Sequence, residues 1–283
     1  MTLSVLLPAS GEDARQALQR LASQSRRPDE VILAASGGQD LRCESDFPFP
    51  VLRESSLDSA LRRASGELIA FCPPEDSLKP EALSRAEQEL RVFPAADAVF
   101  ADAEVEGKAS LWRCAGVDEG RRGLLAAGRV FEAFLGLSGL DGCCLVFRSR
   151  RKDLLLPLPE LPFFAWTLLL ISCVSQVRAL GRPLAARVPY SGSKPPARQR
   201  SKARLLSLEP LLASAIERLE PGQGPWSRPL ALLSAKLEHA RRRARLRERG
   251  RLSRLSGVLR EAYGLDYFRY SGGWASALSD LLA

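Results

Sequence analysis

Short apolar runs alternate with amphipathic stretches along the first hundred residues. The apolar runs are bounded by proline, glycine or polar residues, which is typical of buried strands. The stretches between them place apolar residues three and four positions apart, the spacing of one helix face. This pattern predicts strands at 3–7, 30–34, 51–53, 68–71 and 98–100, and helices at 12–23, 57–64 and 80–93.

Strands that alternate with helices indicate a mostly parallel sheet covered by helices on both faces. Farther along, the pattern predicts a strand at 145–147 and a helix at 165–177. The uncharged stretch 161–177 is too short to cross a bilayer, since a spanning helix needs about 20 apolar residues. We therefore expect a buried core helix there.

The last third of the chain differs from the rest in charge. Residues 191–283 hold 18 Lys and Arg against 8 Asp and Glu, while the first 190 residues hold 23 against 25. A polar, proline-containing stretch at 191–200 predicts a linker, and helical patterns follow it. We expect two parts: residues 1–192 form an α/β domain, and residues 193–283 form a basic, mainly helical extension.

The chain has six cysteines without a C-x-x-C pair, and one histidine, His239. Neither a cysteine-histidine metal site nor a Ser-His-Asp or Cys-His catalytic arrangement is indicated. The N-terminus lacks the pattern of a secretory signal, so we expect buried, reduced thiols and a cytoplasmic protein. His239 falls in a basic helical stretch and is expected at a helix surface.

Four segments form a pattern in order along the chain. Ser4–Pro8 is a strand that ends in proline, and Gln24–Ile32 reads Gln-x-x-x-Pro-x-Glu-Val-Ile. Ala64–Phe71 and Lys79–Leu83 follow, the second with a Pro-x-x-Leu pattern. In this order they resemble the family 2 glycosyltransferases, which have the GT-A fold, and Ala64–Phe71 resembles the run that leads into the family's metal motif. The resemblance implies a GT-A domain with a mixed, mostly parallel sheet flanked by helices.

The resemblance also implies a function. Family members transfer a sugar from a nucleotide-diphosphate donor, and we expect a glycan or lipid-linked acceptor, as in polysaccharide biosynthesis. In the family, the nucleotide lies across the ends of the first, second and fourth strands. By resemblance, the nucleotide-binding residues here are Pro8, Ala9, Ser10, Ser36, Gly37 and Asp58.

The acidic motifs of the family are degenerate in this chain. The base-binding aspartate after the second strand is absent, which leaves Ser36 beside Gly37. In the Asp-x-Asp metal motif, proline replaces the first acid. Glu75 and Asp76 remain as candidate ligands for Mg²⁺ or Mn²⁺, or as ordinary charges near a helix N-terminus.

The usual catalytic acids are also missing. The family's Glu-Asp-x-x-Leu motif aligns with Phe164–Leu168, and Glu160 is the remaining candidate for the general base. The residues that would bind the nucleotide base, hold the metal and transfer the proton all depart from the family pattern. Two interpretations therefore stay open. The chain is either an active hexosyltransferase-type enzyme or a catalytically inactive binding or scaffold protein of a polysaccharide-assembly system.

Eight arginines crowd residues 241–254, with leucines among them. Such a helix can lie on an anionic membrane at the inner face of the cell, or it can be a solvated face that packs its leucines on the domain. Nucleic acid is disfavoured because no recognition motif accompanies the charge. The candidate membrane-facing residues are Arg241, Arg242, Arg243, Arg245, Arg247 and Arg249.

Overall fold

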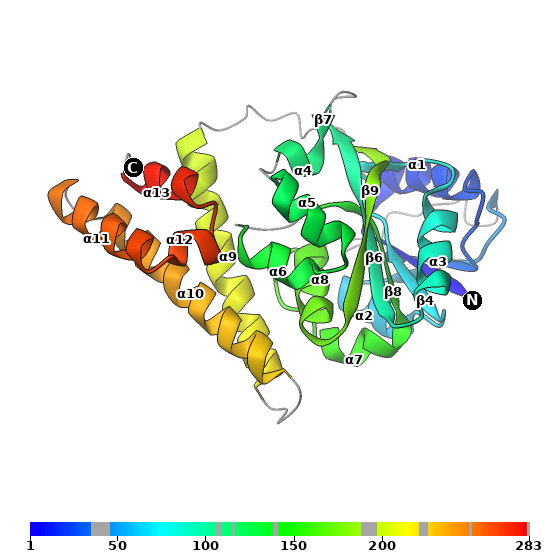
Figure 1. Cartoon of the computed structure of the whole chain (residues 1–283). Coiled ribbons are helices and arrows are strands. Elements are labelled where there is room, and N and C mark those ends of the chain that lie inside the picture. Colours follow the sequence, from blue (N-terminus) through cyan, green and yellow to red (C-terminus); the bar gives the residue numbers. More distant parts are fainter. Residues whose placement is uncertain are drawn as a thin grey trace. The chain divides into compact units, whose positions relative to one another are not determined.

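The structure, a computed structural model, describes residues 1–34, 46–105, 109–114, 117–137, 141–187, 197–220, 226–248 and 251–281 (Figure 1). The chain divides into two compact units. The N-terminal unit comprises residues 1–130 and 141–190, and the C-terminal unit comprises 131–140 and 191–283. Residues 131–140 thus group with the C-terminal unit, although the sequence assigns them to the first part.

A single sheet of nine described strands forms the frame of the N-terminal unit. The strands are β1 (Leu3–Leu7), β2 (Glu30–Ala34), β3 (Val51–Glu54), β4 (Leu68–Phe71), β5 (Asp76–Leu78), β6 (Ala96–Val105), β7 (Ala109–Ser110), β8 (Cys143–Arg148) and β9 (Gln176–Arg187). Their order is β3-β2-β1-β4-β8-β6-β9-β5, with β7 paired to β6. β3, β2, β1 and β4 are mutually parallel, and β8 is antiparallel to both of its neighbours.

Helices cover both faces of this sheet (Figure 1), which confirms the predicted α/β architecture. They are α1 (Gly11–Ala22), α2 (Leu57–Arg63), α3 (Ala82–Val92), α4 (Leu111–Cys114), α5 (Glu119–Ala126), α7 (Lys152–Leu155) and α8 (Phe163–Val174), with a 3-10 turn, η2 (Ser149–Arg151). Helix α6 (Val130–Leu135) lies, apart from Val130, in the segment that belongs to the C-terminal unit.

The strands are apolar on both faces because both are buried. All five residues of β1 are buried, and Leu3, Val5 and Leu7 pack in one cluster with residues of α1 and α3. Burial of each such side chain contributes about 1.5–3 kcal/mol relative to its exposure. On the other face, the ring of Phe163 in α8 lies 4.6 Å from the ring of Phe71 in β4, centroid to centroid.

The sequence pattern located the first four strands and missed much of the second half of the sheet. The strand expected at 98–100 is the ten-residue β6, and β9 was not predicted. β9 carries arginines and half-exposed positions, so it lacks the apolar run that marks β1 or β4. The uncharged helix α8 is buried as expected, and among the described residues no helix is long and apolar enough to span a membrane.

The cysteines that the structure describes fit the prediction of buried thiols. Cys72, Cys143, Cys144 and Cys173 are free and buried. Burial raises the pKa of each thiol, to about 12 for Cys173. These groups therefore stay protonated at neutral pH, and protonated thiols are poor nucleophiles and metal ligands.

The C-terminal unit is helical. Its helices are α9 (Ala197–Leu219), α10 (Ser227–Arg247), α11 (Arg251–Tyr263), α12 (Asp266–Tyr270) and α13 (Trp274–Leu281). The prediction of a linker at 191–200 is wrong for its last residues, because α9 already begins at Ala197.

Buried polar groups hold this unit together. Lys236 of α10 is fully buried, and its Nζ donates to four backbone oxygens, those of Phe134 (3.2 Å), Leu135 (2.7 Å), Leu137 (2.6 Å) and Tyr270 (3.1 Å). An ammonium group has only three protons, so the four acceptors share them. The lysine thereby ties the 131–137 segment to α10 and to the end of α12.

Two of the six candidate membrane-facing arginines are turned inward. Arg243 and Arg247 both pair with Asp280 of α13, whose side chain is fully buried, with nitrogen–oxygen distances of 2.5 Å. The hydroxyl of Tyr267 donates a further hydrogen bond to the same carboxylate, at 2.9 Å. The expectation that all six arginines form one external face is wrong for Arg243 and Arg247, because their charge is neutralised inside the unit.

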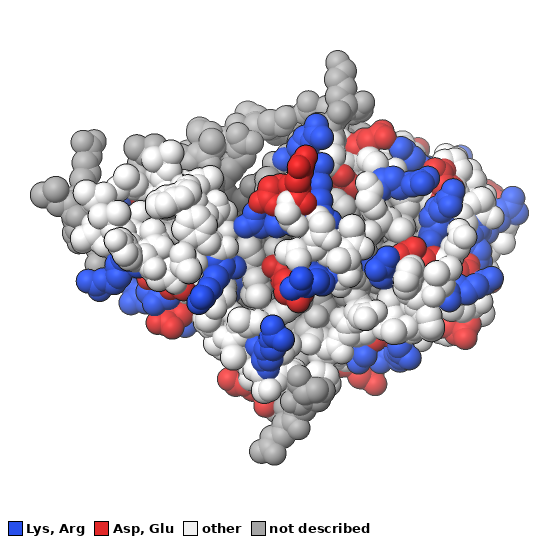
Figure 2. Space-filling view, in the orientation of Figure 1, with Lys and Arg blue, Asp and Glu red and all other residues white. Residues whose placement is uncertain are grey.

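The remaining arginines differ among themselves. Arg241 and Arg245 are exposed, Arg242 is half-buried, and Arg249 lies outside the described residues. Figure 2 shows uncharged side chains gathered over α11 to α13 on the visible face. The exposed large apolar residues of these helices are Leu255, Leu259, Tyr263, Phe268, Trp274 and Leu278. Contact with an anionic membrane stays a prediction.

Candidate functional site

The sheet brings the predicted ligand-binding loops to one edge. Because β2, β1 and β4 are adjacent and parallel, the segments that follow Leu7, Ala34 and Phe71 leave the sheet on the same side. Ligands of open α/β sheets bind outside this carboxyl edge. The loop after β2, with Ser36 and Gly37, lies outside the described residues.

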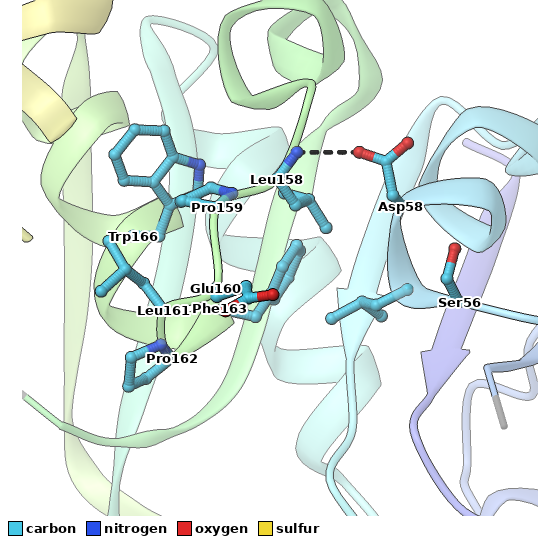
Figure 3. Close-up of a pocket in the computed structure, with 10 residues that line it drawn as sticks. Ser56, Asp58, Leu158, Pro159, Glu160, Leu161, Pro162, Phe163 and Trp166 are labelled. Atoms are coloured by element: carbon cyan, nitrogen blue, oxygen red, sulfur yellow. Dashed lines mark hydrogen bonds between the residues drawn. The ribbon is translucent and has the colours of Figure 1, made fainter. Parts of the chain in front are cut away.

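A pocket of about 470 Å³ opens at this edge (Figure 3). Its walls are the N-terminus of α2, at Ser56–Asp58, and the segment 158–166 that enters α8. Ser56 fixes the first wall as the N-cap of α2, because its hydroxyl accepts a hydrogen bond from the backbone N–H of Ser59. The apolar part of the lining comprises Leu57, Leu158, Pro159, Leu161 and Pro162, with the buried aromatic residues Phe163 and Trp166 of α8.

Asp58 ties the two walls together. Its Oδ1 accepts a hydrogen bond from the backbone N–H of Leu158 at 2.8 Å (Figure 3). Its Oδ2 pairs with Arg62 at 2.8 Å. The backbone hydrogen bond holds the pKa of Asp58 below its ordinary value, assisted by Arg62 and opposed by partial burial. Both carboxylate oxygens are thus engaged, which favours positioning of the pocket wall over direct contact with a nucleotide.

Glu160 is the exposed carboxylate of the pocket. Figure 3 shows its carboxyl group directed into the space between the two walls, beside Phe163. The segment is anchored on both sides, by Asp58 at Leu158 and by Trp166, whose indole N–H donates to the carbonyl of Leu155 at 3.1 Å. A solvent-accessible carboxylate on a braced segment can accept a proton from a bound hydroxyl group.

Of the other predicted nucleotide-binding residues, the three that the structure describes do not line this pocket. Pro8, Ala9 and Ser10 form the turn between β1 and α1, and of these only Ser10 is exposed. Ser10 is the N-cap residue of α1, but its side chain makes no capping hydrogen bond. Because α1 follows β1, its N-terminus with the first N–H groups lies at the same carboxyl edge of the sheet as the pocket.

The two candidate metal ligands occupy different environments. Glu75 is exposed, whereas the Asp76 side chain is 1% exposed. Asp76 begins β5 and lies directly opposite Arg187, the last residue of β9, in the antiparallel register. Arg187 donates from Nε to Asp76 Oδ1 at 2.6 Å and from Nη2 to Asp76 Oδ2 at 3.0 Å.

Arg187 makes two further hydrogen bonds. Its Nη1 donates to Asp141 Oδ2 and its Nη2 to the carbonyl oxygen of Gly142, both at 2.7 Å. Burial opposes the charge, but hydrogen bonding to Asp76 and the charges of Asp141 and Asp76 raise the pKa of Arg187. We call Asp76, Asp141, Gly142 and Arg187 the Arg187 cluster. Its guanidinium group takes both oxygens that Asp76 would offer to a metal, so these residues do not fit a divalent cation.

Neither a protein-family model nor a curated protein sequence matches this chain. Residues 1–349 of S. aureus TarS superpose with a TM-score of 0.57 at 12% identity, over 99% of this chain and 89% of that one. The same fragment in complex with UDP-GlcNAc gives 0.56 at 14% identity, over 85% and 72%. Mannosyltransferase PcManGT from Pyrobaculum calidifontis, in complex with GDP-Man and Mn²⁺, gives 0.53 at 18% identity, over 99% and 86%.

The chain has a GT-A-like fold. It spans 43% of the length of a longer S. aureus TarS chain whose structure is also similar. At these identities the likeness extends to the fold alone. The carboxyl edge that carries Ser10 and Glu160 is the ligand edge expected of such a sheet.

The sequence did not indicate a role for Arg187, and the prediction that His239 lies at a helix surface is wrong. Arg187 is the last residue of a strand that has no apolar run and was therefore not predicted. Its pairing with Asp76 follows only from the register of β5 and β9. His239 is 1% exposed rather than at the surface, and its Nδ1 lies 2.8 Å from Glu261 Oε2.

Among the described residues, one group of three side chains could ligate a metal: His239, Glu261 and Asp266, outside the GT-A-like sheet. Arg242 lies against both carboxylates of this group. Its Nε is 2.9 Å from Glu261, and its Nη2 is 3.0 Å from Asp266. The guanidinium neutralises the acidic pair, so this group is an internal ion-pair network of the C-terminal unit.

Proposed function

We propose that this chain binds a nucleotide-diphosphate sugar at the carboxyl edge of its sheet and transfers the sugar to a glycan or lipid-linked acceptor. The observation that carries this proposal is the pocket at that edge, into which a GT-A-like fold directs the exposed carboxylate of Glu160. TarS in complex with UDP-GlcNAc and PcManGT in complex with GDP-Man share the fold and support the choice of ligand class.

In this proposal the two halves of the ligand occupy different parts of the edge. The nucleotide lies along the turn of Pro8, Ala9 and Ser10 and the loop of Ser36 and Gly37, where backbone N–H groups at the start of α1 favour phosphate. The sugar and its acceptor meet in the pocket. Glu160 takes the proton from the acceptor hydroxyl as its oxygen bonds to the anomeric carbon of the sugar. The bond from that carbon to the diphosphate breaks in the same step, and the nucleoside diphosphate leaves.

The pocket supplies positioning and shelter. The half-buried side chains of Leu57, Leu158 and Leu161 give it an apolar lining, on which the less polar face of a sugar can pack. Asp58 holds the Glu160 segment against α2 through Leu158. A carboxylate held on a braced segment needs little reorganisation when the proton is transferred.

A second candidate function is binding without turnover, as an inactive member of a polysaccharide-assembly system. The observation that favours it is the engagement of the remaining acids, since Asp58 and Asp76 each have both oxygens bonded within the chain. The two functions share the nucleotide ligand and differ only in the fate of the sugar.

Thermal denaturation with UDP and GDP tests the shared part of both functions. A ligand that binds only the folded state, at 100 times its Kd, stabilises it by about 2.7 kcal/mol, which raises the melting temperature by several degrees. We expect such a rise with one of the two nucleotides and a smaller one with the other. No rise with either nucleotide at millimolar concentration contradicts both functions.

A further inference from the structure

The position at which a metal would be expected already holds a cation of the protein itself. In PcManGT, the complex with GDP-Man contains Mn²⁺. Here the segment that follows β4 leads to Asp76, and the partner of Asp76 is the guanidinium group of Arg187. We propose that Arg187 replaces the divalent metal at this site, so that the chain excludes Mg²⁺ and Mn²⁺ and binds its nucleotide ligand without them.

The surroundings of Arg187 are those of a hard-cation site. Four oxygens face the guanidinium: both carboxylate oxygens of Asp76, Oδ2 of Asp141 and the carbonyl oxygen of Gly142, at 2.6 to 3.0 Å. Carboxylate and carbonyl oxygens are also the ligands that Mg²⁺ and Mn²⁺ prefer. The chain therefore has the oxygen shell of a metal site and fills it with an N–H donor.

The fold fixes this arrangement. Asp76 and Arg187 are opposite residues of an antiparallel pair, the arrangement in which side chains of opposite charge meet most closely. Gly142 is a glycine for a steric reason, because an added Cβ would lie 2.6 Å from the carbonyl oxygen of Ala101. Its backbone can thus approach β6 and present its own carbonyl oxygen to Arg187.

Exclusion of a metal follows from charge and from geometry. A bidentate arginine–carboxylate pair is among the strongest hydrogen-bonded pairs in proteins, and a metal would have to displace it. The guanidinium also stays charged at every physiological pH. A second cation beside it would be repelled, and Glu75 alone, exposed on the preceding turn, offers a single carboxylate.

Replacement of Arg187 by glutamine tests the inference as a gain of function. The R187Q change removes the charge and leaves the four oxygens around the vacated space. We expect Mn²⁺ to raise the melting temperature of R187Q by about 3 °C or more and to leave that of the wild type unchanged. Mn²⁺ electron paramagnetic resonance gives a second readout, as one bound ion for each R187Q chain and none for the wild type.

Two variants serve as controls. Arg178 also lies on β9 and pairs with a glutamate, Glu89, at 2.9 Å, so R178Q removes a comparable ion pair away from the site and is expected to gain no Mn²⁺. Lysine at position 187 keeps the positive charge, so R187K is expected to exclude the metal as the wild type does. If R187Q does not fold, as judged by its circular dichroism, the wild-type measurements and R187K decide the question.

The metal measurements need no nucleotide, so they test the inference separately from the proposed function. Stoichiometric Mn²⁺ binding by the wild type that is lost in D76N or E75Q would overturn the inference. So would a folded R187Q that gains no Mn²⁺.

The nucleotide half of the inference rests on the proposed function, and its measurement is the affinity for UDP or GDP in EDTA and in Mn²⁺. Equal affinities support the inference, and binding only with Mn²⁺ contradicts it. Absence of binding in both conditions counts against the proposed function and leaves the metal measurements to decide on Arg187.

Discussion

Replacement of Glu160 by glutamine is expected to lower the turnover of the preferred nucleotide-sugar by about 100-fold or more. Glutamine keeps the size of the side chain and removes its capacity to accept a proton, so the binding of the nucleotide should change little. The loss corresponds to about 2.7 kcal/mol of transition-state stabilisation. Release of UDP or GDP, with and without an added acceptor, measures it.

Asp153 provides a matched control for this variant. It is an exposed acid on α7, in the chain segment just before the pocket, and it does not line the pocket. D153N is expected to keep the turnover of the wild type. Full turnover in E160Q would remove Glu160 from the reaction, and absence of turnover in the wild type with intact nucleotide binding would favour the non-catalytic function.

Replacement of Lys236 by methionine is expected to destabilise the C-terminal unit by about 3 kcal/mol or more. Methionine has nearly the same length, so little cavity forms. What is lost is the ammonium group that four buried backbone oxygens share, from the 131–137 segment and from Tyr270. Buried polar groups that lose a charged partner suffer the full penalty of desolvation.

This effect should be local to one unit. Because the chain has two compact units, one global unfolding free energy is not well defined. Hydrogen exchange resolves the question segment by segment, and in K236M we expect faster exchange in α10, α12 and residues 131–137, with β1 and β4 unchanged. Arg228 is exposed on the same helix, and R228M should exchange like the wild type. A K236M variant with wild-type exchange would contradict the role assigned to the ammonium group.

The sequence was sufficient for the first half of the sheet. β1, β2 and β4 are buried on both faces, so their residues are mostly apolar and mark both the strands and their ends. Proline and serine at the ends of the strands then locate the loops of the carboxyl edge. The position of Ser10 at that edge follows from these boundaries, whereas Asp58 and Glu160 became candidates only through the resemblance to the family.

The rest could not be predicted, because it depends on pairings between distant segments. β9 is only partly buried, and its contact with β5 decides the state of Asp76. The same holds in the C-terminal unit, where a run of arginines typical of a solvated face is in part neutralised by Asp280. In both units the sequence shows which residues are charged, but only the fold shows which residues they pair with.

The two candidate metal sites share this feature. Asp76 with Asp141, and Glu261 with Asp266, each bring two carboxylates together, and each pair is closed by one arginine. Proximity of acids in a sequence or a structure is therefore weak evidence for a metal in this chain. Partners within hydrogen-bonding distance decide whether oxygens remain free for an ion.

The central claim is that a nucleotide-sugar binds at the carboxyl edge of the sheet, between the start of α1 and the pocket of Glu160. Hydrogen exchange with and without UDP- or GDP-sugar tests it most directly, because it locates the ligand on the chain. We predict slower exchange at residues 9–13, 56–60 and 158–163, and unchanged exchange in α12 and α13. Protection confined to the C-terminal unit, or no protection under saturating ligand, would contradict the claim.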